Sequence, residues 1–160
     1  MNLRPFAPDD ATAVSILLNT AFDSPSEAQL VASLRAAGDM ALELVAEDDT
    51  SIYGYIAFCR LREPEGWWSL SPVAVSPRRQ NERIGSDLIN YGLDFARQAG
   101  ARAITVLGSP DYYRRFGFNH KAAENLTIPY DRDYFMLYPI APGTAGTAAT
   151  VSYPQAFSAL

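Results

Sequence analysis

The segment VSPRRQNERIGSDLINYGLDFA, from Val75 to Ala96, contains residues whose order could create an anion-binding site. It reads as the end of a strand, a polar turn from Gln80 to Ser86 and the start of a helix. A helix N-terminus offers unpaired backbone N–H groups and a partial positive charge, and both attract phosphate. The pattern alone is a weak indication of a site, because many turns of this kind bind nothing.

Arg83 occupies a place in this turn where glycine would let the backbone approach a phosphate closely. An arginine suits the turn only if its φ angle is negative, and its guanidinium group then either obstructs the loop or adds a charged contact. We expect the backbone N–H of Arg83 to donate to the anion, with its side chain pointing away from the concave face of the loop.

Hydrophobic periodicity predicts the elements that position this turn. Strands are expected at residues 3–6, 41–48, 51–61, 67–75, 102–108, 126–130 and 134–140, and helices at 8–22, 25–38, 84–99 and 109–117. The strand that ends at Val75, the helix that follows it and the strand at 103–107 form a βαβ unit with two parallel strands. Pro72 cannot donate to a strand ladder, so it predicts a bulge or a local parting of strands.

Apolar residues on both faces of the strand at 51–61 indicate a sheet that helices cover on both sides. The chain is therefore predicted to be an α/β or α+β protein. In the long helix, one buried face is expected to contain Ile84, Leu88, Tyr91, Gly92, Phe95 and Ala99.

Composition limits the classes of function. The chain has 160 residues and a net charge of −5, which predicts one domain and argues against nucleic-acid binding. Its one cysteine, Cys59, excludes an internal disulfide and a cysteine-rich metal site, and it is interpreted as a small core residue. No signal peptide or membrane span is expected, so the predicted location is the cytoplasm. The tail from about residue 141, rich in Ala, Gly and Thr, is expected to be loosely ordered.

Two motifs in order, SPVAVSPRRQNERIGSDLI and then VLGSPDYYRRFGF, resemble the GNAT superfamily of acyl-CoA-dependent N-acyltransferases, in particular its small bacterial YhbS-like branch. The resemblance covers Leu70 to Phe118 well, and LRPFAPDDATAVSILLNTAF is similar to the first strand and helix of the family. It implies a mixed, strongly twisted sheet of about six to seven strands flanked by helices. It also implies direct acetyl transfer from acetyl-CoA to a primary amine of a small molecule or peptide, without a metal. Homodimer formation is left open.

The resemblance also implies roles for individual residues. The pantetheine arm of coenzyme A would lie along Val73, Ala74 and Val75. The pyrophosphate would meet a loop made of Gln80, Asn81, Glu82, Arg83, Ile84, Gly85 and Ser86. Tyr113, four residues before Gly117, falls where the family has a tyrosine that protonates the departing thiolate. Without the resemblance, Tyr113 would be interpreted as a half-buried aromatic residue on a short helix.

Two questions about the chemistry stay open. The strand at 67–75 offers only Ser69 and Ser71, and no carboxylate that could act as a general base. A water chain, or an amine that arrives deprotonated, would then be required. Glu27, Trp68 and Ser71 are the candidates for substrate contact. The alternative hypothesis is a non-catalytic binding or regulatory module with the same fold, in which Arg83 has made the coenzyme A loop unproductive.

Overall fold

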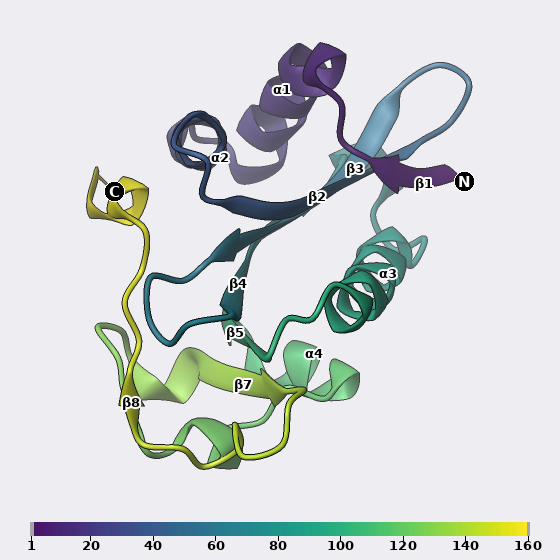
Figure 1. The fold of residues 1–160 in the computed structure, drawn as a ribbon. Coiled ribbons are helices and arrows are strands. Elements are labelled where there is room, and N and C mark those ends of the chain that lie inside the picture. Colours follow the sequence, from purple (N-terminus) through teal and green to yellow (C-terminus); the bar gives the residue numbers. More distant parts are fainter. Residues whose placement is uncertain (1, 160) are drawn as a thin grey trace.

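The computed structural model describes residues 2–159. Its main sheet has six strands in the order β1-β2-β3-β4-β5-β7 (Figure 1). Their bounds are β1 (Asn2–Pro5), β2 (Met40–Glu47), β3 (Ile52–Arg60), β4 (Trp67–Val75), β5 (Ala103–Leu107) and β7 (Phe135–Pro139). A separate parallel pair joins β6 (Leu126–Thr127) to β8 (Ala149–Thr150). Within the main sheet β4 and β5 are parallel and the other neighbours are antiparallel, so the predicted mixed sheet is confirmed.

Helices cover both faces of the sheet, as the apolar strands predicted. One face is covered by α1 (Ala11–Phe22) and α2 (Ser26–Ala36), and the other by α3 (Ile84–Gln98) (Figure 1). The short helix α4 (Pro110–Tyr113) follows β5. No helix among residues 2–159 has the length and apolar character to cross a membrane.

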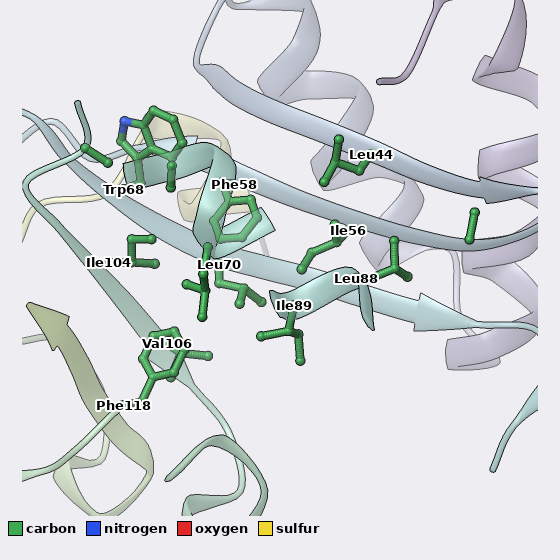
Figure 2. Packing of buried hydrophobic residues seen from close by; sticks show 14 of the residues in the cluster. Leu44, Ile56, Phe58, Trp68, Leu70, Leu88, Ile89, Ile104, Val106 and Phe118 are labelled. Atoms are coloured by element: carbon green, nitrogen blue, oxygen red, sulfur yellow. The ribbon is translucent and has the colours of Figure 1, made fainter. Parts of the chain in front are cut away.

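The largest core cluster lies between the sheet and α3 (Figure 2). From α3 it receives Ile84, Leu88, Ile89, Leu93 and Ala96. The predicted buried face was therefore partly wrong, because Tyr91 is 39% exposed and stacks on Phe95 at 5.3 Å between ring centroids. Gly92 lies directly against Phe58: a Cβ atom at Gly92 would come within 2.5 Å of the Phe58 ring.

The two parallel strands part near their carboxyl ends, and this gap organises the site. Their pairing runs from Trp67 opposite Ala103 to Leu70 opposite Val106 and goes no further, although β4 continues to Val75. On its other edge β4 pairs with β3, where Leu70 lies opposite Phe58 and Val73 lies opposite Ile56. Two residues therefore separate the paired positions on β4 and only one on β3, so β4 carries an extra residue. The bulge predicted at Pro72 is confirmed. Beyond Leu70, the β5-facing edge of β4 has no partner in that strand.

The segment from residue 141 onward, expected to be loosely ordered, contains a short strand and several buried residues. β8 pairs with β6, and Thr144 and Val151 are only 4% and 3% exposed. Further along, Phe157 packs in a cluster with Leu30 and Leu34 of α2. Figure 1 shows the chain running from β8 along the side of the sheet away from α3 and ending near α2. A few apolar anchors thus hold a segment that is otherwise made of small residues.

Candidate functional site

A cavity of about 730 Å³ opens at the N-terminus of α3. Its walls come from the end of β4, the turn before α3, the first turns of α3, and the segment of α4 that continues to Phe116. The lining residues are Val73, Val75, Arg79, Gln80, Asn81, Arg83, Ile84, Gly85, Ser86, Asp87, Asn90, Tyr112, Arg115 and Phe116. The structure therefore brings together most of the residues that the sequence assigned to a cofactor.

Two of the expected cofactor residues do not line this cavity. The side chain of Ala74 is buried on the opposite face of β4, in the cluster beneath α1. Glu82 instead forms an ion pair with Arg79, with Oε1 3.1 Å from Nε. Side chains alternate along a strand, so Val73 and Val75 reach the cavity while Ala74 between them does not.

The turn before α3 contains two residues in the left-handed region, Asn81 at φ 71° and Arg83 at φ 65°. The expectation of a negative φ at Arg83 was therefore wrong. Arg83 is the residue that leads the chain into α3, and its carbonyl already accepts the helical hydrogen bond from Asp87. When residues alternate between left-handed and other conformations, successive N–H groups point to one side and form a concave anion-binding surface.

The left-handed conformation of Arg83 makes a prediction about stability. A non-glycine residue in this region costs about 1–2 kcal/mol, whereas glycine adopts it freely. Arg83→Gly should therefore raise the free energy of unfolding by about 1 kcal/mol, or roughly 2–4 °C in Tm. Differential scanning calorimetry would measure it. Gln80→Gly is the matched control, because Gln80 has φ −70° and glycine there should only destabilise. A Tm that falls equally in both variants would contradict the inference that the backbone is strained at Arg83.

Three arginines line the cavity, and their partners differ. Arg79 pairs with Asp48 at 2.9 Å and with Glu82, and it stacks 4.0 Å from the centre of the Tyr53 ring. Arg115 stacks on the Tyr112 and Phe116 rings and donates from Nη2 to the Ser86 hydroxyl at 3.4 Å. The charge of Arg79 is thus already compensated, while Arg115 has no carboxylate partner within residues 2–159.

Sequence reasoning missed the second wall of this cavity. Tyr112, Arg115 and Phe116 line it, and the Tyr112 hydroxyl lies 3.2 Å from where a Cβ atom of Gly85 would be. The available signal was the basic and aromatic run YYRRF, one of only two basic clusters in the chain. Its importance depends on tertiary folding, because α4 follows β5 and comes to face the turn before α3.

Tyr113 ends α4 and rests on the end of β5. A Cβ atom at Gly108 would come within 2.6 Å of the Tyr113 ring, so the glycine makes room for it. The ring also meets Phe118 edge-on, at 5.8 Å between centroids. Burial, with a smaller contribution from Tyr112, raises the pKa of Tyr113 to about 12. Tyr113 is not among the residues that line the large cavity, and it lies at the strand ends beside it.

The three substrate candidates lie in different environments. Ser71 is half-buried on β4 at the gap between the parallel strands. Glu27 is half-buried at the start of α2, and its Oε1 atom is enclosed without a hydrogen-bond partner among the described residues. Trp68 lies in the core beside Phe58 on the α3 face (Figure 2). It also lines a second cavity of about 490 Å³. Trp68 and Ser71 thus lie in different environments.

Other chemically capable residues take structural places. Cys59 is fully buried, and burial raises the pKa of its thiol to about 12, in agreement with its interpretation as a core residue. His120 lies near the surface, with Nε2 2.7 Å from the carbonyl oxygen of Asp133. Within the described range, no three His, Cys, Asp or Glu side chains gather as a metal site would require.

Comparisons with known proteins agree with this geometry. Residues 12–118 match the model of the Acetyltransferase (GNAT) family. The chain is 33% identical to the uncharacterized N-acetyltransferase YhbS of Escherichia coli K12, over 99% of each chain.

Two solved structures extend the likeness to three dimensions. The crystal structure of E. coli YhbS in complex with CoA matches with a TM-score of 0.91 at 32% identity, covering 98% of this chain and 91% of that one. A GNAT family acetyltransferase from Brucella melitensis in complex with acetyl-CoA matches with a TM-score of 0.84 at 36% identity, covering 98% and 97%. Sequence, fold and the cavity at α3 therefore lead to one conclusion: the chain belongs to the GNAT family of acetyltransferases.

Proposed function

We propose that this chain is an acetyl-CoA-dependent N-acetyltransferase that moves an acetyl group directly to a primary amine of a small molecule or peptide. The observation that carries the proposal is the continuity of two features. The cavity is lined both by Val73 and Val75, which lie on β4 beyond its last pairing with β5, and by the turn before α3. An acyl thioester on a long phosphorylated carrier needs both features, one at each end.

The residues present fit coenzyme A. The volume of about 730 Å³ is typical of small-molecule sites, which range over roughly 300–1,000 Å³. Backbone N–H groups from Asn81 to Ser86 would hold the pyrophosphate, assisted by Arg115. The unpaired edge of Val73–Val75 offers main-chain groups to the amides of the pantetheine arm. The structures of the two relatives described above, which contain CoA and acetyl-CoA, support this assignment.

In the proposed reaction, acetyl-CoA supplies the acetyl group as a thioester. The amine nitrogen forms a bond to the carbonyl carbon, the carbon–sulfur bond breaks, and the amine releases a proton to water. Tyr113 donates its phenolic proton to the departing sulfur and regains a proton from water, which balances the proton that the amine released. Because burial raises the pKa of Tyr113 to about 12, its hydroxyl is protonated at neutral pH, as an acid must be. Glu27 and Ser71 are proposed as contacts to the acceptor.

A ligand titration tests the proposal directly. At 100 times its Kd, acetyl-CoA should stabilise the folded chain by about 2.7 kcal/mol, which corresponds to a rise in Tm of roughly 5–10 °C. Thermal denaturation with increasing acetyl-CoA or CoA provides the measurement. No change in Tm at millimolar ligand would refute the proposed activity. If acetyl-CoA binds, thiol release with a panel of amines, antibiotics and peptides would identify the acceptor.

Arg115 should contribute to this affinity through its uncompensated charge. Arg115→Ala is expected to weaken CoA binding by about tenfold, equivalent to 1.4 kcal/mol. The difference between variant and wild type should shrink at high salt, because screening weakens the ionic contact. Isothermal titration calorimetry measures both effects. Arg114→Ala is the matched control, since Arg114 is exposed and does not line the cavity. Equal losses in the two variants would contradict a specific role for Arg115.

The alternative is a binding or regulatory module that no longer uses coenzyme A productively. Arg83 favours it, because this left-handed position suits glycine, which would let the backbone approach the phosphates more closely. If Arg83 is tolerated in a working site, Arg83→Gly should change acetyl-CoA affinity by no more than about tenfold. A much larger gain would show that the arginine obstructs the loop and would favour the alternative.

A further inference from the structure

A cluster of hydroxyl groups lies on the sheet face opposite α3, close to the gap between the parallel strands. Ser69 on β4 is paired with Thr105 on β5, and the next pair, Leu70 with Val106, is the last before the strands part. A strand rises about 3.3 Å per residue, so these hydroxyls lie only one to two residues from the start of the gap. They lie on the face away from the core cluster under α3, to which Leu70 and Val106 contribute.

The Thr105 hydroxyl is buried without a hydrogen bond of normal length and angle among the described residues. The residue is 0% exposed, and its Oγ1 atom has no hydrogen-bond partner among residues 2–159. Ser69 beside it is 4% exposed. A buried hydroxyl that lacks a partner loses its hydration without compensation, so proteins retain few of them. The site is therefore polar, shielded from water and short of hydrogen-bonding groups.

The ordered tail brings a third hydroxyl to this place. Tyr153 packs against the cluster that contains Trp67 and Ala103, two residues before Ser69 and Thr105 on the same sheet face. Its ring meets Tyr130 and Phe157 at 5.2 and 5.0 Å between centroids. Burial raises the pKa of Tyr153, and contact with Thr105 and Ser69 offsets part of that rise. The phenol is therefore neutral at physiological pH and retains an oxygen that can accept a hydrogen bond.

We propose that Ser69, Thr105 and Tyr153 form the acceptor side of the reaction centre, where they receive the amine in its neutral form. This inference rests on the proposed function. Neutral oxygens around the reacting nitrogen hydrogen-bond to its N–H groups but do not compensate the charge of an ammonium ion, and Glu27 is assigned to a different part of the acceptor. Burial therefore favours the deprotonated amine, which has the free lone pair needed for attack. The cluster would thus favour the deprotonated amine, although β4 provides no carboxylate base to deprotonate it.

Matched variants separate this role from a structural one. Thr105→Val keeps the shape and removes the hydroxyl, and Tyr153→Phe removes only the phenolic oxygen. Each should lower kcat/KM for the amine at least tenfold, and the Kd for acetyl-CoA should change less than about twofold. Thr105→Ser should restore activity because it restores the oxygen. Tyr91→Phe serves as the control, since Tyr91 is exposed on α3.

Thermal stability provides a second test of the proposal, because Tm and activity should change in opposite directions. Because the Thr105 hydroxyl makes no hydrogen bond of normal geometry among residues 2–159, Thr105→Val should keep or raise Tm while activity falls. The pH profile provides a third test, since wild-type kcat/KM should rise with pH until the free amine is deprotonated. A fall in Tm would mean that the hydroxyl has a structural partner. That result, or full kcat/KM in both variants, would overturn the inference.

An activity-independent measurement completes the test. With ¹³C-labelled threonine methyl groups, the NMR signal of Thr105 should shift more on addition of acetyl-CoA than on addition of CoA, because only the former brings the acetyl group to the gap. Binding of acetyl-CoA without any shift at Thr105 would overturn the inference and leave the proposed function intact. Absence of acetyl-CoA binding by wild type would instead defeat the proposed function itself.

Discussion

Tyr113→Phe is expected to lower kcat by roughly 10²–10⁴-fold, the usual contribution of a general acid, while the Kd for acetyl-CoA stays nearly unchanged. The phenolic oxygen is the only atom removed, so the ring should keep its contact with Gly108 and Phe118. Steady-state kinetics with the acceptor found by thiol release, together with calorimetric titration of CoA, separate the two quantities.

A second variant tests the position of the hydroxyl. In Gly108→Ala, the added Cβ atom would come within 2.6 Å of the Tyr113 ring and must displace it. Turnover should fall although the phenol is still present, because proton transfer depends on alignment with the leaving sulfur. Tyr91→Phe provides the control for loss of a phenol elsewhere. Full turnover in Tyr113→Phe would show that this tyrosine is only a packing residue.

The second large effect concerns stability. Gly92→Leu should lower the free energy of unfolding by about 3 kcal/mol, because its Cβ atom would lie 2.5 Å from a Phe58 ring that is 0% exposed. A gain in helix propensity of about 1 kcal/mol offsets only part of that loss. Tm should fall by roughly 6–12 °C in calorimetry.

The control is Gln98→Leu, which adds the same side chain to the exposed end of α3. It should change the free energy of unfolding by no more than about 0.5 kcal/mol. Equal stability of wild type and Gly92→Leu would mean that the sheet and α3 can move apart, contrary to the close packing described above.

Local pattern predicted the elements that create the site. The apolar strand before Val75 and the strand at 103–107 could be parallel only with a helix between them, and Pro72 marked the bulge. The buried face of α3 was harder to predict. Ile84, Leu88 and Gly92 were placed correctly, but Ala99 was not, because it is exposed. Helical spacing also assigned Tyr91 and Phe95 to this face. In the structure they stack on each other, which lets a helix carry apolar rings near its surface.

Other features depend on information that no short stretch of sequence contains. The φ angle of Arg83 follows from the direction in which the chain must enter α3, and sterics alone argued for the opposite sign. Tyr112 and Arg115 acquire meaning only when α4 folds back beside α3. Tyr153 reaches Ser69 and Thr105 through a tail whose few large side chains are spaced among small ones. In each case the missing information was a tertiary contact between distant segments.

The placement of the tail also bears on how the chain folds during its synthesis. Ala156 and Phe157 pack against Leu30, Leu34 and Cys59, yet they leave the ribosome well after those residues. A nascent chain that has already formed β2, β3, α1 and α2 must therefore expose an apolar surface until Ala156 and Phe157 have been synthesised. A truncation before Ala156 would leave this surface open to aggregation or to chaperones.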